Sequence, residues 1–218
     1  MKKRMFALML GAVILPSVSP LFAEGMVFGI KGGSTMATGT GEDAENLSMK
    51  TGAAGGVFMC YRVTRIFGIQ PELLLVMKGA KDDGWRDINN NAINASMMLN
   101  YFEIPLLLKV NIPLEGKIEP SLYSGPALGI LMSAREKIEG ESVDIKGLFK
   151  SIDIGIIVGA GVGYEMGKGS LILEVRYEIG MSTVMDLGAE ELAAEGLTAQ
   201  PDVRNSVSSI MIGYGFAF

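Results

Sequence analysis

Residues 206–218, at the end of the chain, constrain the fold more than any other stretch, because their side chains alternate in size with a period of two. Large apolar residues share one parity: Ile210, Ile212, Tyr214, Phe216 and Phe218. The other parity is mostly small: Val207, Ser209, Met211, Gly213, Gly215 and Ala217. A period of two indicates a β-strand. A large apolar face opposite a small face is typical of a strand between lipid and a crowded barrel interior.

Such a strand needs a partner on each edge, because every unpaired backbone group in hydrocarbon costs several kcal/mol. The other strands are therefore expected to close a barrel with it. Segment 171–181 supports this interpretation, since its odd positions are apolar or aromatic, whereas Glu174, Arg176 and Glu178 share the even parity. Three successive charges on one face exclude a dry apolar core there and suit a polar lumen.

This alternation, repeated along the chain, predicts an all-β fold: an eight-stranded antiparallel up-and-down transmembrane β-barrel. The strands are expected near residues 26–36, 50–63, 66–80, 96–111, 117–132, 150–166, 169–183 and 204–218. Their connections alternate in length: 37–49, 81–95, 133–149 and 184–203 are long, whereas 64–65, 112–116 and 167–168 are tight. Bacterial outer-membrane barrels have even strand numbers, short periplasmic turns and longer external loops. We therefore predict that both termini are periplasmic.

The first 23 residues have the pattern of a cleavable signal peptide, which leaves 24–218 as the barrel domain. Basic residues at positions 2–4 precede an apolar run over residues 5–15, and Ala23 ends the segment. The run is shorter than the roughly 17–25 residues of a spanning helix. Without residues 1–23 the chain has 16 basic and 24 acidic residues, a net charge of −8. This acidity argues against nucleic acid as a partner.

Alternation also places a set of charged side chains on the inward parity. They are Lys31, Arg62, Glu72, Lys78, Glu103, Lys109, Glu119, Asp153, Glu165, Glu174, Arg176 and Glu178. An eight-stranded barrel is just wide enough inside for side chains to fill. We interpret these charges as ion pairs that fill and rigidify the lumen; the alternative is a selective pore or proton path. Acids outnumber bases seven to five, so some acids are expected to be protonated, hydrated or exposed at a rim.

Aromatic residues gather on the outward parity near the predicted periplasmic end, where they are expected to form a membrane-interface girdle. They are Phe28, Tyr61, Phe67, Tyr164, Phe216 and Phe218. The opposite end has methionines at the outward positions: Met77, Met98, Met132 and Met181. The single Cys60 cannot form an internal disulfide and is expected to pack inward near the periplasmic end.

Four prolines fall inside the predicted strands: Pro71, Pro105, Pro120 and Pro126. Proline removes a hydrogen-bond donor from a β-ladder. We interpret these residues as marks of bulges or of a distorted patch of the wall.

Catalytic, cofactor and metal sites are not expected. The sequence has no histidine, which removes Ser-His and Asp-His catalysis and His-ligated metals. A carboxylate pair remains conceivable, but Glu174 and Glu178 face a narrow lumen. Loop 81–95 has Trp85, a potential headgroup anchor or partner contact, and several Asp and Asn oxygens, but their spacing matches no calcium loop. Residues 189–195 are expected to form a short helical turn.

The segment Asn100-Tyr-Phe-Glu-Ile-Pro-Leu-Leu-Leu-Lys-Val110 resembles the PorT-like outer-membrane β-barrel family. Three further segments resemble its other strands: Gln70-Pro-Glu-Leu-Leu74, Phe28-Gly-Ile-Lys-Gly-Gly33 and Tyr123-Ser-Gly-Pro126. The resemblance spans residues 25–218. It implies an eight-stranded outer-membrane barrel and accommodates the prolines, because the family has proline at matching places. Some members of that family are linked to protein secretion, but no residue of this chain supports assigning that role to it.

The leading hypothesis is a small non-enzymatic outer-membrane barrel with a structural or surface-interaction role through acidic extracellular loops. Its expected partners are outer-membrane lipid, the barrel-assembly machinery through the C-terminal strand, and an envelope protein that the sequence does not identify. One alternative is a narrow channel or a barrel associated with envelope transport or secretion. Another is a secreted soluble barrel with an apolar ligand, which requires the apolar parity to face inward.

The parity of segment 171–181 predicts the outcome of a cysteine scan in a background that lacks Cys60. Cysteines at odd positions should react with lipid-soluble reagents, because these side chains are expected to face acyl chains, and those at even positions should be protected. The measurement is labelling of the protein reconstituted in vesicles. Equal labelling of both parities would contradict the barrel assignment.

Overall fold

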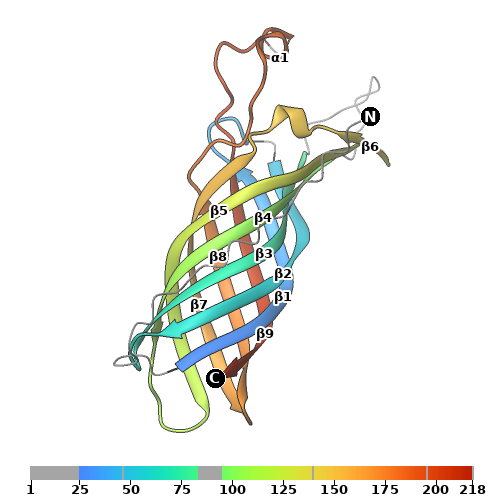
Figure 1. Cartoon of the computed structure of the whole chain (residues 1–218). Coiled ribbons are helices and arrows are strands. Elements are labelled where there is room, and N and C mark those ends of the chain that lie inside the picture. The colour runs from blue at the N-terminus through green and yellow to red at the C-terminus, as the bar shows by residue number, and fades with distance from the viewer. Residues whose placement is uncertain (1–24, 46, 83–94, 139, 195, 218) are drawn as a thin grey trace, which may run out of the picture.

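The alternating segments form the wall of a closed antiparallel barrel (Figure 1). The computed structural model describes residues 25–45, 47–82, 95–138, 140–194 and 196–217. The wall consists of β1 (Gly25–Thr40), β2 (Leu47–Arg62), β3 (Phe67–Asp82), β4 (Ala95–Asn111), β5 (Ile118–Ile138), β7 (Ile152–Met166), β8 (Gly169–Gly180) and β9 (Arg204–Ala217). Neighbours follow the order β4-β3-β2-β1-β9-β8-β7-β5, and β4 also pairs with β5. The eight-stranded barrel predicted from the sequence is therefore confirmed.

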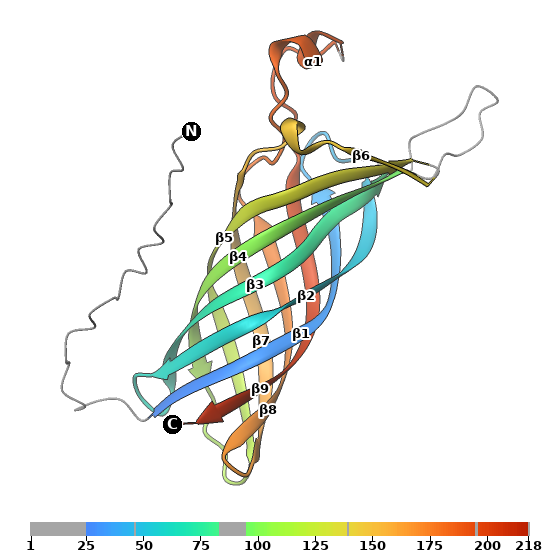
Figure 2. The same cartoon turned by 45° about the vertical axis from the view of Figure 1, so that its right-hand side comes forward.

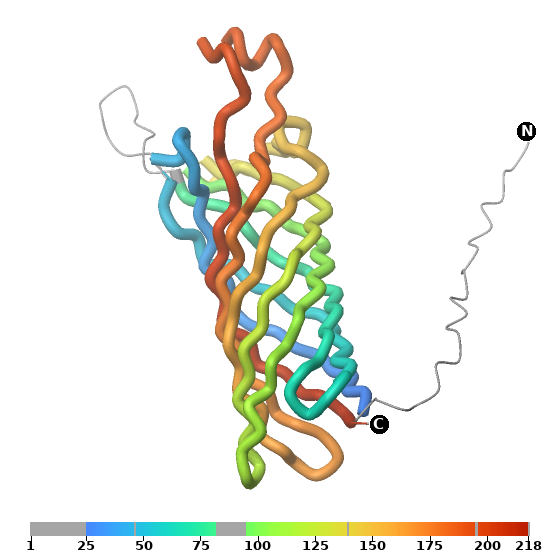
Figure 3. The backbone as a smooth tube through the Cα atoms, turned by 90° about the vertical axis from the view of Figure 1, so that its left-hand side faces the viewer, coloured from blue at the N-terminus to red at the C-terminus, as the bar shows by residue number. Residues whose placement is uncertain are grey.

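The strands are strongly tilted, and the two ends of the barrel differ (Figures 1 and 2). One end, the turn end, carries the short turns and the adjacent ends of β1 and β9. The other, the loop end, carries the connections from β1 to β2, from β5 to β7 and from β8 to β9. The connection predicted at 37–49 is shorter than expected, because β1 continues to Thr40 and β2 begins at Leu47. The connection from β8 to β9 rises farthest above the barrel and contains α1 (Ala189–Ala194), as the tube in Figure 3 also shows. The short helical turn predicted there is confirmed. A short 3₁₀ helix, η1 (Lys146–Leu148), lies at the same end.

The connection expected at 133–149 is largely regular structure. Strand β5 continues to Ile138 and forms a hairpin with β6 (Glu141–Asp144). In the backbone register of this hairpin, Arg135 is opposite Asp144. The predicted strand 117–132 ends earlier than β5 because residue 132 ends the run of large apolar residues on the outward parity. The extension has polar residues on both faces, so it gives no such signal although its backbone remains paired. At the same end, β8 stops at Gly180 instead of the expected 183.

The prolines do not create bulges. Pro71 is opposite Leu106 and Pro105 is opposite Ala127, and the ladder pairing lapses for two residues beside each proline. It then resumes in the same register, because a missing N–H removes hydrogen bonds without adding a residue to either strand. The register shifts of the wall lie elsewhere, between Met49 and Ala54 and between Asn100 and Tyr101. Of the two alternatives predicted for the prolines, bulges are wrong, whereas the interrupted pairing agrees with a distorted patch of the wall.

The apolar parity faces outward around the whole barrel. On neighbouring strands, Ile30, Val57 and Leu73 are 63%, 48% and 46% exposed. The predicted lipid-facing residues of β9 are exposed as well, and β9 pairs with both β1 and β8. The hypothesis of a soluble barrel with an apolar interior is therefore wrong. No helix among the described residues is long and apolar enough to cross a membrane.

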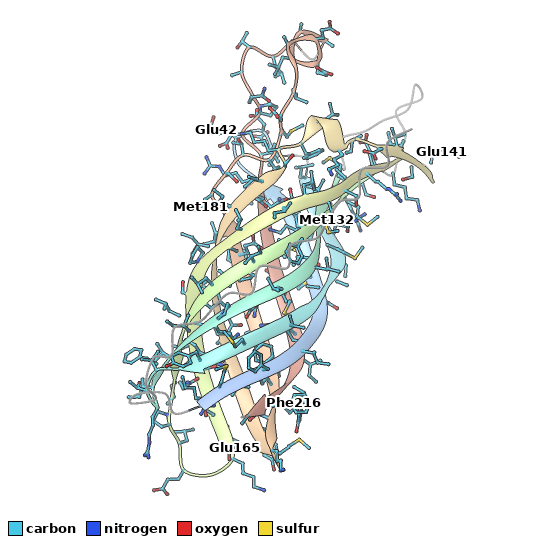
Figure 4. All side chains as sticks on the ribbon, in the orientation of Figure 1. Glu42, Met132, Glu141, Glu165, Met181 and Phe216 are labelled. Carbon is cyan, nitrogen blue, oxygen red and sulfur yellow. The ribbon has the colours of Figure 1, made fainter. Side chains whose placement is uncertain are left out.

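The outward aromatic residues lie near the turn end, as expected. Phe28, Phe67, Tyr164 and Phe216 are exposed, and Tyr61 is half-buried. Figure 4 shows Phe216 near the turn end and Met132 and Met181 closer to the loop end. Other predictions concern segments outside the described residues: the signal peptide 1–23, the loop with Trp85, and Phe218.

A charge on the outward face should destabilise the barrel. Val175, near the middle of β8, is 50% exposed. Its replacement by Arg is expected to cost about 2–4 kcal/mol of unfolding free energy in a bilayer, because a cation would then sit among acyl chains. Reversible urea unfolding in lipid vesicles measures this change. The control Glu141→Arg, in the exposed β5–β6 hairpin, should change the free energy little; similar costs for both variants would contradict the membrane orientation of the wall.

Candidate functional site in the filled lumen

Four buried charged side chains form an ion cluster across the barrel, in the half nearer the turn end. This turn-side cluster consists of Lys31 of β1, Glu72 of β3, and Glu174 and Arg176 of β8. The Lys31 Nζ donates to Glu72 Oε1 at 2.5 Å and to Glu174 Oε2 at 2.8 Å. The Arg176 guanidinium donates to Glu72 Oε2 at 2.9 Å and to Glu174 Oε2 at 2.7 Å. Two cations therefore face two carboxylates, and the cluster is electrically balanced.

Aromatic rings enclose the turn-side cluster. The Lys31 Nζ lies 5.2 Å from the centroid of the Phe58 ring, and the Arg176 guanidinium lies 5.3 Å from the centroid of Tyr123. Cations over ring faces gain a further electrostatic attraction when water is excluded. The rings also occupy the space that glycines leave on neighbouring strands. A Cβ at Gly159 would lie 2.5 Å from Tyr123.

A second cluster lies nearer the loop end and has an excess of acid. This loop-side cluster consists of Lys78 of β3, Glu103 of β4, Asp153 of β7 and Glu178 of β8. The Lys78 Nζ is 2.5 Å from Glu178 Oε1, 3.3 Å from Asp153 Oδ2 and 3.9 Å from Glu103 Oε2. One ammonium thus faces three carboxylates, and Glu103 is the most weakly paired of them.

Neutral groups complete the loop-side cluster. Asn205 of β9 donates from Nδ2 to Asp153 Oδ2 at 2.8 Å, and Ser182 donates to Asp153 Oδ1 at 3.2 Å. The Tyr101 ring centroid is 5.0 Å from the Lys78 Nζ. The two clusters together link six of the barrel strands through their interior side chains. Such buried charges are tolerable only when each meets a partner.

An apolar cap closes the lumen above the loop-side cluster. Its buried members are Leu99, Tyr101, Leu131, Ala134, Phe149, Val184 and Val203. Backbone hydrogen bonds tie its loop segments together: Lys150 N–H donates to the Val184 carbonyl, and Val184 N–H donates to the Val203 carbonyl. Half-buried residues from η1 and its surroundings, Ile145 and Leu148 among them, pack against it. The loop end of the lumen is therefore sealed by side chains.

The remaining predicted inward charges lie at the turn end and are less enclosed. Arg62 Nη2 contacts Glu119 at 3.0 Å across the mouth, and both side chains are partly exposed. Lys109 is half-buried and Glu165 is exposed, as Figure 4 shows for Glu165 at the turn end. Cys60 is buried and lines the same region, on the side predicted for it.

Sequence reasoning placed the charges of both clusters but missed their neutral partners and the cap. Asn205, Tyr101 and Tyr123 have the inward parity, so alternation is a sufficient signal for these uncharged residues as well. Phe149 and Val184 lie in connections without periodicity, and no sequence signal marks them as part of the lumen. Among the described residues, no group of three or more acidic or thiol side chains is arranged to hold a metal ion.

Two of the segments at the loop end are acidic. Glu42, Asp43 and Glu45 lie between β1 and β2, and the connection from β8 to β9 contains several acids but no Lys or Arg between residues 181 and 203. The two segments meet where Asp202 N–H donates to Asp43 Oδ2 at 2.8 Å. Gln200 fixes the longer one, because its side-chain amide exchanges two hydrogen bonds with the Leu187 backbone at 2.8 and 2.7 Å.

Comparisons with known proteins agree with this architecture. The family described as "Outer membrane protein beta-barrel domain" matches residues 22–186. Among solved structures, Neisserial surface protein A has a TM-score of 0.50 and 13% identity, covering 88% of this chain and 97% of that one. The outer membrane protein OprG from Pseudomonas aeruginosa has the same score and identity, covering 90% and 97%. A comparison with curated protein sequences finds no match. At this identity the structural matches support the fold alone.

Removing the single cation of the loop-side cluster should destabilise the barrel. Lys78→Met leaves three buried carboxylates without an ammonium and is expected to cost about 3–5 kcal/mol of unfolding free energy. Urea unfolding followed by heat-modifiable gel migration measures this. Arg204→Met, which breaks an exposed pair with Asp202, should cost less than about 1 kcal/mol. Glu103→Gln should be neutral or stabilising, because it lowers the acid excess. A Lys78 variant as stable as the Arg204 variant would contradict the structural role of the cluster.

Proposed function

The chain belongs to the outer membrane protein beta-barrel domain family, and from that premise we propose that it acts at the bacterial cell surface as a non-enzymatic interaction protein. The observation that carries the proposal is the division of the molecule along its axis. The lumen is filled by two ion clusters and an apolar cap, whereas the acidic connections stand outside the barrel. At the loop end, the part of the chain that remains available to partners is therefore its outer surface.

The proposed orientation follows from loop length. Short turns are periplasmic and long loops external in barrels of this class, so the turn end faces the periplasm and the loop end faces the exterior. The more specific assignment to PorT-like barrels is also part of the proposal. It is supported by the segment around Glu103 and Pro105, in which Glu103 belongs to the loop-side cluster and Pro105 lies beside an interruption of the β4–β5 ladder.

Charge indicates the class of partner. The connection from β8 to β9 and the neighbouring residues 41–45 are acidic. Glu190 and Glu191 belong to α1, which lies well above the barrel (Figure 1). A concentrated negative surface attracts basic partners and accelerates their encounter. We infer that the natural partner presents a basic surface, such as a lysine-rich segment of an envelope or extracellular protein.

Binding of a lysine-rich peptide to vesicles that carry the protein tests this function. Wild-type vesicles should retain the peptide more strongly than empty ones, and the difference should shrink with added salt, because exposed charges are screened. Glu190→Gln combined with Glu191→Gln should lower binding at least twofold. The matched control removes two acids from the β5–β6 hairpin, Glu141→Gln and Asp144→Asn, and should bind as the wild type does. Equal loss in both double variants, or no binding beyond that of empty vesicles, would refute the assignment.

The filled lumen gives a separate prediction against the channel alternative. Planar bilayers with verified insertion of the protein should show no discrete conductance, because the cap and both ion clusters obstruct the axis. Phe149→Ala should remain silent as well, since the clusters below it are intact. Steady single-channel steps from the wild-type protein that change with Arg176→Met would instead establish a pore.

A further inference from the structure

The turn end of the lumen contains a hollow that neither the ion clusters nor the proposed surface role uses. An outer chamber of about 390 Å³ is lined by the ends of β1, β7, β8 and β9. An inner pocket of about 40 Å³ lies beside it and extends to Gln70 and Asn111. Val27, Arg62 and Ser170 line both spaces, so the two adjoin. We call them together the vestibule.

Most of the unpartnered buried side-chain polar atoms among the described residues line the vestibule; the exception is Arg176 Nε in the turn-side cluster. Asn111 is 2% exposed, and both its Nδ2 and its Oδ1 lack a hydrogen-bond partner. Gln70 is 1% exposed; its Nε2 donates to Glu72, but its Oε1 has no partner. Buried polar atoms are normally satisfied, and each exception carries a desolvation cost of about 1–3 kcal/mol. Both side chains line the inner pocket, so a ligand there meets a free donor and two free acceptors.

Charged side chains of opposite sign line the vestibule from different strands. Lys109 of β4 lines the inner pocket, Glu165 of β7 lines both spaces, and neither has an ion-pair partner within 4.0 Å among the described residues. Lys168 at the outer mouth is likewise unpaired within the described part of the chain. Arg62 and Glu119 neutralise each other at 3.0 Å. The vestibule therefore offers one unpaired cation, Lys109, in the inner pocket, and one unpaired anion, Glu165, together with Lys168 nearer the opening.

The remaining lining is apolar or small. Val27, Phe58 and Ile172 line the inner pocket, and Gly163 leaves space beside them. An occupant is thus expected to carry two opposite charges, a group that both donates and accepts hydrogen bonds, and a small apolar part. The free α-carboxylate, α-ammonium and amide of a short peptide combine these features.

We propose that the vestibule binds a small zwitterion of the amino-acid or dipeptide class. The ligand carboxylate pairs with Lys109, its ammonium pairs with Glu165, and its amide meets the Asn111 side chain and Gln70 Oε1. The outer chamber admits the ligand from the solvent at the turn end. This binding is independent of the acidic surface at the loop end and goes beyond the proposed surface role.

Calorimetric titration of the folded protein in detergent with alanyl-alanine tests the proposal. Binding should be saturable, and N-acetylalanine and alaninamide, which each lack one of the two charges, should bind at least tenfold more weakly. Lys109→Met and Glu165→Gln should each lower the affinity for alanyl-alanine at least tenfold. The ligand should also slow modification of Cys60 by a small thiol reagent, because this only cysteine lines the inner pocket.

Matched controls lie in the neighbouring turn. Lys117→Met and Glu115→Gln remove the same types of charge outside the vestibule and should leave the affinity unchanged. Absence of saturable binding to protein that still shows heat-modifiable migration would overturn the proposal, because water alone would then satisfy Asn111. Equal affinity for the dipeptide and its singly charged analogues would overturn it as well.

Discussion

Pairing of opposite charges inside a wall too narrow for bulk water is the constraint on which this barrel depends. Eight strands leave an interior that side chains fill, and a buried charge without a partner is strongly destabilising. The chain meets this constraint with two clusters, centred on Lys31 with Arg176 and on Lys78. Because the partners of each cation come from different strands, the same contacts that neutralise charge also tie opposite sides of the wall together.

The charge balance and polarity of the interior side chains change along the barrel axis. The turn-side cluster is balanced, the loop-side cluster has excess acid, and the cap above it excludes water with residues such as Phe149 and Val184. In the vestibule, Gln70 Oε1 and both side-chain polar atoms of Asn111 have no hydrogen-bond partner. The molecule therefore has a capped lumen with two acidic connections at one end and a small recess at the other.

The elements of this chain that are predictable from sequence are those in which apolar and polar side chains alternate with a period of two. Within the membrane-facing wall, lipid on one side and packed charges on the other impose a period of two, so the strands and residues such as Glu174 and Arg176 were predictable. Beyond that zone the outward face of a strand no longer meets lipid, so the continuation of β5 to Ile138 lacks the period-two signal. The cap residue Phe149 and the pairing distances within each cluster depend on tertiary geometry, which residue order alone does not encode.

The pairing of β9 with β1 has a consequence for biosynthesis. Val27 meets Ala217, so the seam that closes the wall joins the two extremes of the barrel domain. Contacts so distant in sequence form slowly, and closure must wait until the final strand has been synthesised. Until then the nascent chain exposes two unpaired edges and a continuous apolar face, a state prone to aggregation. This exposure during synthesis is set by the location of the seam and is independent of what the finished protein binds.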